Sequence, residues 1–291
     1  MPHNHDHTAK NLKTAFFLNL GFSLIELVGG ILTNSLAIVS DAIHDFGDSF
    51  VLALSWFAER ISKRGKDSKF TFGYRRVSLV GALINAGVLL IGAVMVLREA
   101  IPRLWEPQQP DPVGMLALAL LGILVNGLAV LRLRHEESLN SRMVFLHLME
   151  DILGWTAIFV VSILMLFFDV PILDPILSIL ISIIILIAIY RILRQTMRIV
   201  LQGVPKNIDL DDVRKKITAI DGIETIHDLH LWTLDGEFNI LTAHVVLEID
   251  AKTTELLPLK SKIRSTLQNL GIQHVTVEFE TCDEACDHLN C

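Results

Sequence analysis

Six long apolar stretches constrain the fold of this chain more than any other feature. They lie at residues 14–33, 36–58, 77–101, 113–132, 143–168 and 172–192. Each is close to the roughly 20 apolar residues that a helix needs to cross a bilayer. In the hydrocarbon region only helices and closed barrels satisfy their own backbone hydrogen bonds. The sequence therefore predicts a polytopic α-helical membrane domain with six transmembrane helices, and it excludes a single soluble globule.

Positive charge is concentrated in alternate connections between these stretches. Seven lysines and arginines lie in residues 60–76 and three in 132–142, whereas the first and fifth connections have none. Cytoplasmic loops carry the excess of positive charge in membrane proteins, so both termini are predicted to be cytoplasmic. An even number of spans gives the same result. We therefore expect a multi-pass protein of the cell membrane, surrounded by the lipid bilayer.

The chain changes character after residue 204. Residues 205–291 carry 16 acidic and 8 basic side chains, a net charge of −8, whereas residues 1–204 are near neutral. Helical spacing at 209–220 is followed by alternating strands at 224–234 and 238–249 around Asp235-Gly236, by helical spacing at 254–270 and by a strand at 273–280. This order predicts a small α+β cytoplasmic domain (αββαβ). The acidic balance excludes a basic nucleic-acid binder, so no nucleic acid is expected among the partners.

These changes in composition predict four parts of the chain. They are a His-bearing N-terminal tail (1–12), a transmembrane domain (13–204), a cytoplasmic α+β domain (205–281) and a Cys-containing C-terminal tail (282–291). All three cysteines fall in the last of these. An odd number of cysteines in an acidic tail favours thiols or metal ligands over disulfides.

Ionisable residues inside the predicted spans are costly in lipid, so each is a candidate functional residue. The second stretch contains His44 and Asp48, which lie one turn apart on one helix face, and the fifth repeats the pattern with His147 and Asp151. Two imidazoles and two carboxylates form a four-ligand set that suits Zn²⁺, with Cd²⁺ and Co²⁺ as chemical neighbours. The alternative is that these residues make hydrogen bonds between helices.

Other polar residues in the spans have less defined roles. Asp41, Asp45 and Glu150 are either partners that orient the imidazoles or residues that pack polar helix faces. Glu26 in the first stretch is interpreted as a helix-packing contact or as part of a cavity lining.

Short motifs along nearly the whole chain carry a resemblance to a known family. They are Ser40-Asp41-Ala42-Ile43-His44, Thr71-Phe72-Gly73-Tyr74, His147-Leu148-Met149-Glu150-Asp151, Asp174-Pro175, Gly203-Val204-Pro205 and His227-Asp228-Leu229-His230-Leu231-Trp232. In these motifs the chain resembles the cation diffusion facilitators, which are zinc-type proton-coupled metal exporters.

The resemblance implies a homodimer with a ferredoxin-like, metallochaperone-like cytoplasmic domain, and it assigns the transport site to His44, Asp48, His147 and Asp151. It also implies a preference for zinc where His occupies the first of these positions. The compact length and the absence of a long His-rich loop are similar to bacterial members, which implies the inner membrane of a bacterium.

The resemblance also implies a second metal site in the cytoplasmic domain. His227, His244 and Glu280 match the family's metal-binding positions there. Cys282 and Cys286 follow directly and either complete this site or belong to a reduced, solvated tail. The histidines of the N-terminal tail either capture metal or are solvated; they are His3, His5 and His7.

Together these observations predict a secondary active transporter that exports Zn²⁺ in exchange for protons, with Zn²⁺ also as a regulatory ligand. Metal and proton compete for the same imidazole nitrogen, which explains the coupling. An intramembrane metalloenzyme would need an open metal position and a general base, as in His-Glu-x-x-His, and the sequence lacks that motif. A channel would favour weaker, multi-site binding. We therefore expect a transporter and not an enzyme.

Overall fold

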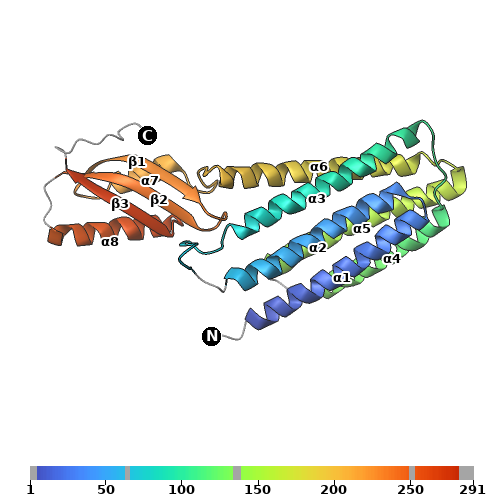
Figure 1. The fold of residues 1–291 in the computed structure, drawn as a ribbon, viewed down its shortest axis with the longest axis horizontal. Helices are drawn as coiled ribbons and strands as arrows, with labels where there is room; N and C mark the ends of the chain where they lie inside the picture. Colours follow the sequence, from blue (N-terminus) through green and yellow to red (C-terminus); the bar gives the residue numbers. More distant parts are fainter. Residues whose placement is uncertain (1–4, 63–65, 134–138, 249–252, 282–291) are drawn as a thin grey trace. The chain divides into compact units, whose positions relative to one another are not determined.

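The computed structural model consists of six long helices followed by a small α+β region (Figure 1). It describes residues 5–62, 66–133, 139–248 and 253–281. Contacts within the chain divide it into two compact units, one formed by residues 1–65 and 80–193 and the other by residues 66–79 and 194–291.

The long helices coincide with the six predicted stretches. Their bounds are α1 (His5–Leu32), α2 (Leu36–Ser62), α3 (Val77–Ala100), α4 (Pro112–Leu133), α5 (Leu139–Phe168) and α6 (Leu173–Val200), with a short 3₁₀ turn η1 (Pro102–Leu104) after α3. Helices α1 and α6 extend past the predicted spans because their polar ends keep helical geometry beyond the apolar stretch; in α6 this end includes Arg194 and Arg198.

Four helical segments in the described residues are long and apolar enough to cross a membrane: Val77–Leu104, Pro112–Leu131, Leu148–Phe168 and Leu173–Val200. Helix α1 adds a shorter apolar segment, Phe16–Leu32. Helix α2 carries Asp41, Asp45 and Asp48 within its length, so its apolar character is interrupted where the functional candidates lie. Large apolar side chains such as Ile91 and Phe167 are exposed on the outer faces of the helices, as expected for contact with lipid.

Helix α1 packs along α2, and α4 packs along α5. A buried cluster around Trp155 joins α2, α4, α5 and α6. Gly122 permits the close approach of α4 to this indole, because a Cβ atom at position 122 would overlap the ring of Trp155. A second buried cluster joins α3 to α6 through Leu89, Ala93 and Ile185.

The buried carboxylate of Asp174 ties the start of α6 to the start of α2. It accepts hydrogen bonds from the hydroxyl of Ser35 at 2.6 Å and from the backbone amides of Leu36 at 2.9 Å and Ala37 at 3.2 Å. These amides belong to the first turn of α2 and have no partner within their own helix. Asp174 therefore caps α2 from a distant part of the sequence.

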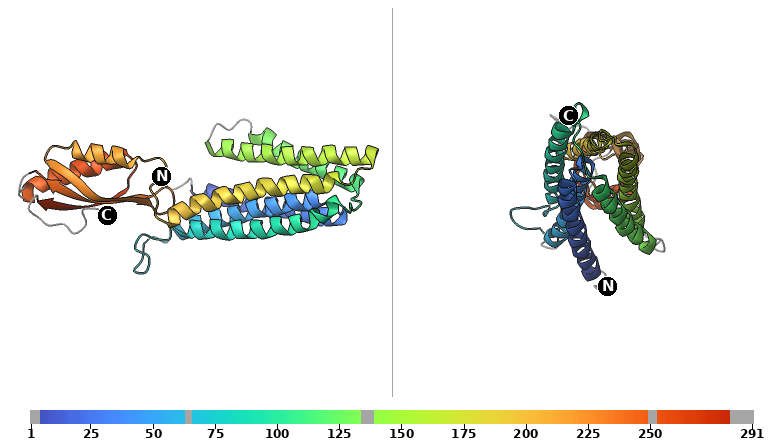
Figure 2. Two further views of the ribbon diagram at one scale, coloured as in Figure 1. Left: turned by 90° about the horizontal axis from the view of Figure 1, so that it is seen from above. Right: turned by 90° about the vertical axis from the view of Figure 1, so that its right-hand side faces the viewer.

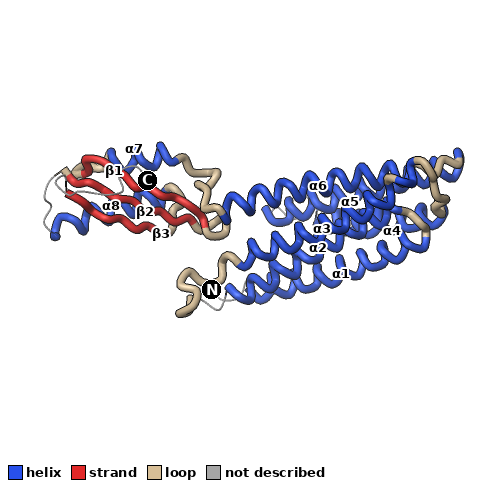
Figure 3. Tube along the Cα trace, turned by 45° about the horizontal axis from the view of Figure 1, so that its top comes forward, coloured by secondary structure: helices blue, strands red, loops and turns tan. Residues whose placement is uncertain are grey.

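The second unit contains α7 (Leu210–Thr218), β1 (Ile223–Thr233), β2 (Asn239–Leu247), α8 (Thr253–Asn269) and β3 (His274–Thr281), which confirms the predicted αββαβ order. Strand β2 lies in the middle of the sheet, antiparallel to β1 and parallel to β3. The strands in the described residues all belong to this unit (Figure 3).

Both helices of this unit cover the same face of the sheet (Figure 2). Val213 and Ile217 of α7 and Ile263 of α8 pack against alternate residues of β2, which include Leu241 and Val245. Side chains alternate between the two faces of a strand. The residues between them, including His244, therefore lie on the face of the sheet that faces away from the helices.

Residues 66–79 belong to the second unit. They comprise the end of the connection from α2 to α3 and the first residues of α3, and they pack on the β1–β2 turn. The guanidinium of Arg75 lies 3.1 Å from the carboxylate of Asp235 and 4.5 Å from the ring centre of Phe238. The ring of Phe72 contacts His274 at the start of β3. Within the connection itself, Asp67 accepts hydrogen bonds from Tyr74 and from two backbone amides.

Candidate functional site

The transmembrane candidates on α2 lie on one side of that helix. Nε2 of His44 is 3.7 Å from Oδ2 of Asp48, and the two side chains are 27% and 28% exposed. This spacing follows from the helix itself, since residues four apart lie one above the other. An imidazole nitrogen and a carboxylate oxygen thus lie side by side within a predicted membrane span.

Helix α5 brings Asp151 to the same level. It contacts α2, and a Cβ atom at Gly154 of α5 would lie 3.4 Å from Oδ1 of Asp41. Asp151 lies within electrostatic range of Asp41 and Asp45 on α2. The structure therefore brings Asp151 of α5 near Asp41 and Asp45 of α2, the helix that also carries His44 and Asp48. The backbone of His147 lies one turn before Asp151 on α5, and its side chain falls outside the described part of the chain.

The remaining acidic residues of α2 differ from this pair in burial. Asp41 and Asp45 are only 7% and 5% exposed, and they lie beside Glu26 of α1, which is 1% exposed. The sequence interpretation gave Glu26 only a packing or lining role. Its charge within a predicted span is the sequence signal that could have identified Glu26 as a functional candidate, since ionisable residues in spans are candidates by default.

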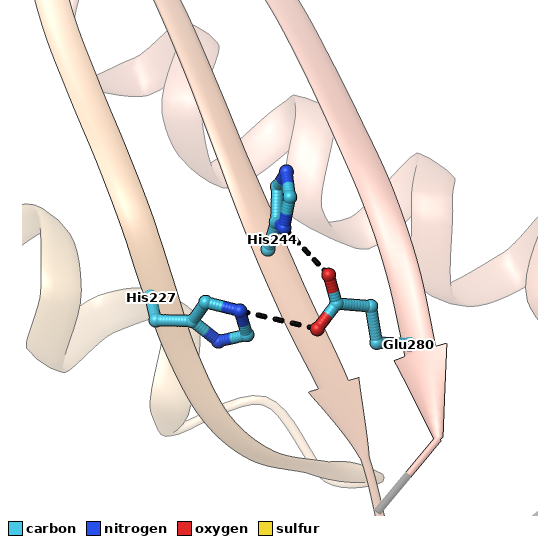
Figure 4. A group of neighbouring side chains, drawn as sticks. All are labelled: His227, His244 and Glu280. Carbon is cyan, nitrogen blue, oxygen red and sulfur yellow. Dashed lines mark ion pairs between the residues drawn. The ribbon is translucent and has the colours of Figure 1, made fainter. Parts of the chain in front are cut away.

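The cytoplasmic candidates come from three adjacent strands. His227 lies on β1, His244 on β2 and Glu280 on β3, and Figure 4 shows the three side chains pointing toward one another. Nε2 of His227 is 3.1 Å from Oε2 of Glu280, and Nδ1 of His244 is 2.5 Å from Oε1 of the same carboxylate. The strand register produces this cluster, because His227 pairs with His244 across the sheet and Glu280 follows two residues after the partner of His244.

The chemistry of this cluster fits a metal ion. Two imidazole nitrogens and a carboxylate oxygen lie within 4.8 Å of one another. Nε2 of His227 is buried, and its contact with Glu280 does not have the geometry of a hydrogen bond. This nitrogen therefore has no hydrogen-bond partner among the described residues. Zinc takes three such protein ligands when a fourth position stays open.

A second layer of polar groups surrounds His244. A bulge in β1 between His227 and His230 places Asp228 in the left-handed region at φ +46°, which turns its carboxylate toward the cluster. Oδ2 of Asp228 lies 3.5 Å from Nε2 of His244, and Oδ1 lies 2.7 Å from Nε2 of His230. Glu278, which is largely exposed, lies 3.6 Å from the same nitrogen of His244. Carboxylates in this position commonly orient a metal-binding imidazole.

Several predicted ligands fall outside the described residues. Cys282, Cys286 and His3 belong to the undescribed ends of the chain, and for His5 and His7 only the helical backbone is described. Their roles stay predictions.

Comparisons with known proteins place the chain in a family. Residues 12–201 match the family model of the cation efflux transmembrane domain, and residues 205–282 match that of the cation efflux protein cytoplasmic domain, a dimerisation domain. The chain belongs to the cation efflux family, which is the cation diffusion facilitator family of metal transporters. Members of this family are transporters and not enzymes.

Curated relatives match along the whole chain. The "Cadmium, cobalt and zinc/H(+)-K(+) antiporter" of Bacillus subtilis is 34% identical over 100% of this chain and 94% of its own length. The "Zinc transporter ZitB" of Escherichia coli is 31% identical over 100% of this chain and 96% of its own. The solved metal-bound C-terminal domain of the CzcD transporter from Cupriavidus metallidurans is 37% identical and covers 25% of this chain and 99% of that domain, with a TM-score of 0.23.

Proposed function

We propose that this protein exports Zn²⁺ from the cytosol in exchange for protons, by alternating access at a site formed by His44, Asp48, His147 and Asp151. The observation that supports the proposal is the partly exposed His44–Asp48 pair on α2, a helix that α5 contacts and whose Asp45 lies within electrostatic range of Asp151. The names of the relatives support the substrate, since they refer to zinc, cadmium and cobalt. The mixture of nitrogen and oxygen donors favours zinc over harder cations, with Cd²⁺ and Co²⁺ as alternative substrates.

The charge of the four ligands explains why metal and protons exchange. With both imidazoles neutral, the two carboxylates give the site a charge of −2, which one divalent ion compensates. An empty site would leave these carboxylates uncompensated inside a membrane span, which is unfavourable. Protons that bind the ligands after the metal leaves remove this charge, and histidine has the unperturbed pKa nearest to neutral pH. The counter-ion is therefore the proton, with K⁺ as a second candidate because the Bacillus subtilis relative is named for both.

In the cytoplasmic domain, His227, His244 and Glu280 would hold a regulatory Zn²⁺, with Cys282 and Cys286 as further candidate ligands. Their preassembled geometry supports this assignment, as does Nε2 of His227, which has no hydrogen-bond partner among the described residues. Residues 205–291 carry a net charge of −8, so in a homodimer two acidic domains repel each other. A bound divalent ion offsets part of that repulsion and favours their association.

The membrane arrangement completes the proposal. We infer that both termini are cytoplasmic and that the protein resides in the inner membrane of a bacterium, because basic residues concentrate in alternate connections and the relatives are bacterial. The chain would comprise a tail at 1–12, the transmembrane domain at 13–204, the cytoplasmic domain at 205–281 and a tail at 282–291.

Transport by the purified full-length protein in sealed proteoliposomes tests this function. We expect an acidic lumen to drive zinc accumulation, a protonophore to stop it, and added zinc to make the lumen more alkaline. Zinc accumulation that neither depends on the pH gradient nor changes the lumenal pH would contradict proton exchange. Rapid zinc equilibration that never exceeds the external concentration would instead indicate a channel.

A further inference from the structure

The exposed face of α6 changes from apolar to basic along a single line. The exposed residues of this line recur three and four positions apart, which places them on one side of the helix. They are Leu180, Ile183, Ile187, Tyr190, Arg194 and Arg198. The opposite side is buried, since Ile185 and Ile189 pack in the cluster shared with α3. Helix α6 therefore presents an outer stripe that is apolar over residues 180–187 and then aromatic and basic.

The length of α6 places this change at the surface of the bilayer. The helix has 28 residues, and at about 1.5 Å per residue it is about 42 Å long, whereas the hydrocarbon core is about 30 Å thick. A span that begins at Leu173 leaves this core after about 20 residues, close to Tyr190 and Arg191. Tyrosine is enriched at this depth because its ring is apolar and its hydroxyl is polar. Arg194 then lies at the level of the lipid headgroups.

The positive charges at this end of α6 lack a nearby acidic counterpart. The sequence has no aspartate or glutamate from residue 175 to residue 208. Within the described part of the chain, the exposed guanidinium groups of Arg191 and Arg194 make neither an ion pair nor a hydrogen bond. Arg75 differs, since it lies 3.1 Å from a carboxylate of the second unit. The pair on α6 is therefore available to an anion from outside the chain.

Arg198, on the same stripe, already has a role in the fold. Its Nε donates a hydrogen bond at 3.1 Å to the carbonyl of Val204, beyond the end of the helix. A cation in the last turn also interacts favourably with the helix dipole. These two effects account for Arg198 but not for Arg194, one turn earlier, or for Arg191, which lies two turns earlier.

We propose that Arg191, Arg194 and Tyr190 bind the phosphate of an anionic phospholipid whose acyl chains lie along residues 180–187. Guanidinium groups hold phosphate oxygens in a bidentate manner, and the tyrosine hydroxyl supplies a further donor. A zwitterionic lipid has the same phosphate, but its ammonium group cancels the charge, so the site prefers lipids with a net negative charge. Free phosphate lacks acyl chains and gains nothing from the apolar part of the stripe.

The test measures lipid preference on the full-length protein in detergent. The protein is mixed with equal amounts of phosphatidylglycerol and phosphatidylcholine, the latter with deuterated acyl chains, and native mass spectrometry counts each lipid bound per protomer. The double variant Arg191→Gln/Arg194→Gln is compared with Lys215→Gln/Lys260→Gln, which removes two exposed positive charges from α7 and α8. A parallel sample contains inorganic phosphate.

We expect the wild type and the lysine variant to bind phosphatidylglycerol in excess over phosphatidylcholine. The excess falls about 10- to 30-fold in the arginine variant, because each arginine near an anionic lipid contributes to binding. Inorganic phosphate leaves the bound lipid in place. No excess in the wild type, or the wild-type excess in the arginine variant, would overturn the proposal.

Two further outcomes point to other occupants and also overturn it. Release of phosphatidylglycerol by inorganic phosphate indicates a site for free anions. An arginine variant that is monomeric but keeps the lipid preference indicates that these arginines hold the acidic domain of a second copy. If the double variant does not purify as a folded protein, Arg194→Gln alone is measured. A fall in the excess of about 5-fold then supports the lipid site, and an unchanged excess overturns it.

Discussion

The transmembrane and cytoplasmic candidate sites use the same kinds of ligand on different scaffolds. On α2, His44 and Asp48 are 3.7 Å apart and partly exposed, and the other two positions belong to a separate helix, α5. In the cytoplasmic domain, His227, His244 and Glu280 lie on hydrogen-bonded neighbouring strands, and both imidazoles already contact the carboxylate. Separate helices can move relative to each other, whereas paired strands hold their register.

This difference matches different tasks. A transporter must assemble ligands around an ion on one side of the membrane and release it on the other, so ligands divided between movable helices suit transport. A site that senses metal gains affinity when its ligands are preorganised. We therefore assign turnover to the transmembrane residues and stable binding to the cytoplasmic cluster.

Loss of a transmembrane ligand has the largest expected effect. Asp48→Asn lowers the initial rate of zinc uptake into proteoliposomes by more than about 100-fold, since even the loss of an outer-shell partner of a metal ligand costs about 10- to 100-fold. The matched control is Asp169→Asn after α5, where the backbone at φ +48° readily accommodates Asn. Near-normal uptake by Asp48→Asn would remove this residue from the transport site.

Loss of a cytoplasmic ligand affects binding instead of turnover. In full-length protein that also carries Asp48→Asn, Glu280→Gln weakens zinc binding at the remaining site by about 10- to 100-fold. Glu237→Gln in the β1–β2 turn is the control, because the side chain of Glu237 is exposed and does not belong to the cluster of His227, His244 and Glu280. Titration calorimetry measures both, and equal affinities for the two variants would contradict the ligand role of Glu280.

The sequence predicted most of the architecture because the relevant signals are local. Apolar length located the six helices, and the alternation of strand residues located β1, β2 and β3. The helix ends were misjudged where polar residues such as Arg194 continue the helix, since hydropathy records burial in lipid and not backbone geometry. His227, His244 and Glu280 came from the family resemblance, because residues distant in sequence meet only through strand pairing.

The division of the acidic residues of α2 lay beyond sequence reasoning. Asp41, His44, Asp45 and Asp48 form one stripe on a helical projection, and only the packing of α2 against its neighbouring helices separates the buried pair from the partly exposed pair. For the same reason Glu26 was assigned a packing role. The sequence shows that it is charged, but not that it has no hydrogen-bond donor among the described residues and lies within electrostatic range of Asp41 and Asp45.

The two fully buried carboxylates, Asp174 and Glu26, should respond differently to the loss of their charge. Asp174→Asn weakens three hydrogen bonds that cap α2 and lowers the free energy of unfolding by about 2 kcal/mol. Glu26→Gln removes an unsatisfied charge, so the melting temperature of the detergent-solubilised protein stays the same or rises. A thermal melting series on both variants checks this, and equal destabilisation would contradict the distinction.

The smallest expected effect concerns Arg75 and Asp235 in the second unit. Burial alone would raise the pKa of Asp235, but hydrogen bonds from the amides of Phe238 and Glu237 and the charge of Arg75 together lower this pKa below its usual range. A lowered pKa stabilises the fold above the unfolded value near 4, and this contribution disappears as the pH falls through the folded value.

Arg75→Gln should therefore reduce stability by less than about 1 kcal/mol at neutral pH, because the pair is at the surface. The difference shrinks toward acidic pH, where Asp235 takes up a proton in both proteins. Arg76→Ala, an exposed neighbour, is the control. Melting curves of the full-length variants between neutral pH and pH of about 3 measure this, and a deficit that is constant across that range would indicate packing against Phe238 as its source.

The most direct test of the assignment removes the cytoplasmic cluster entirely. A full-length variant with His227→Ala, His244→Ala and Glu280→Gln is reconstituted, and its zinc uptake and proton exchange are measured at saturating zinc beside the wild type. We expect the variant to keep most of the uptake rate and an unchanged number of protons per zinc ion, because the ligands on α2 and α5 bind the transported ion. A folded variant without zinc uptake would contradict it and would place the cytoplasmic cluster on the transport path.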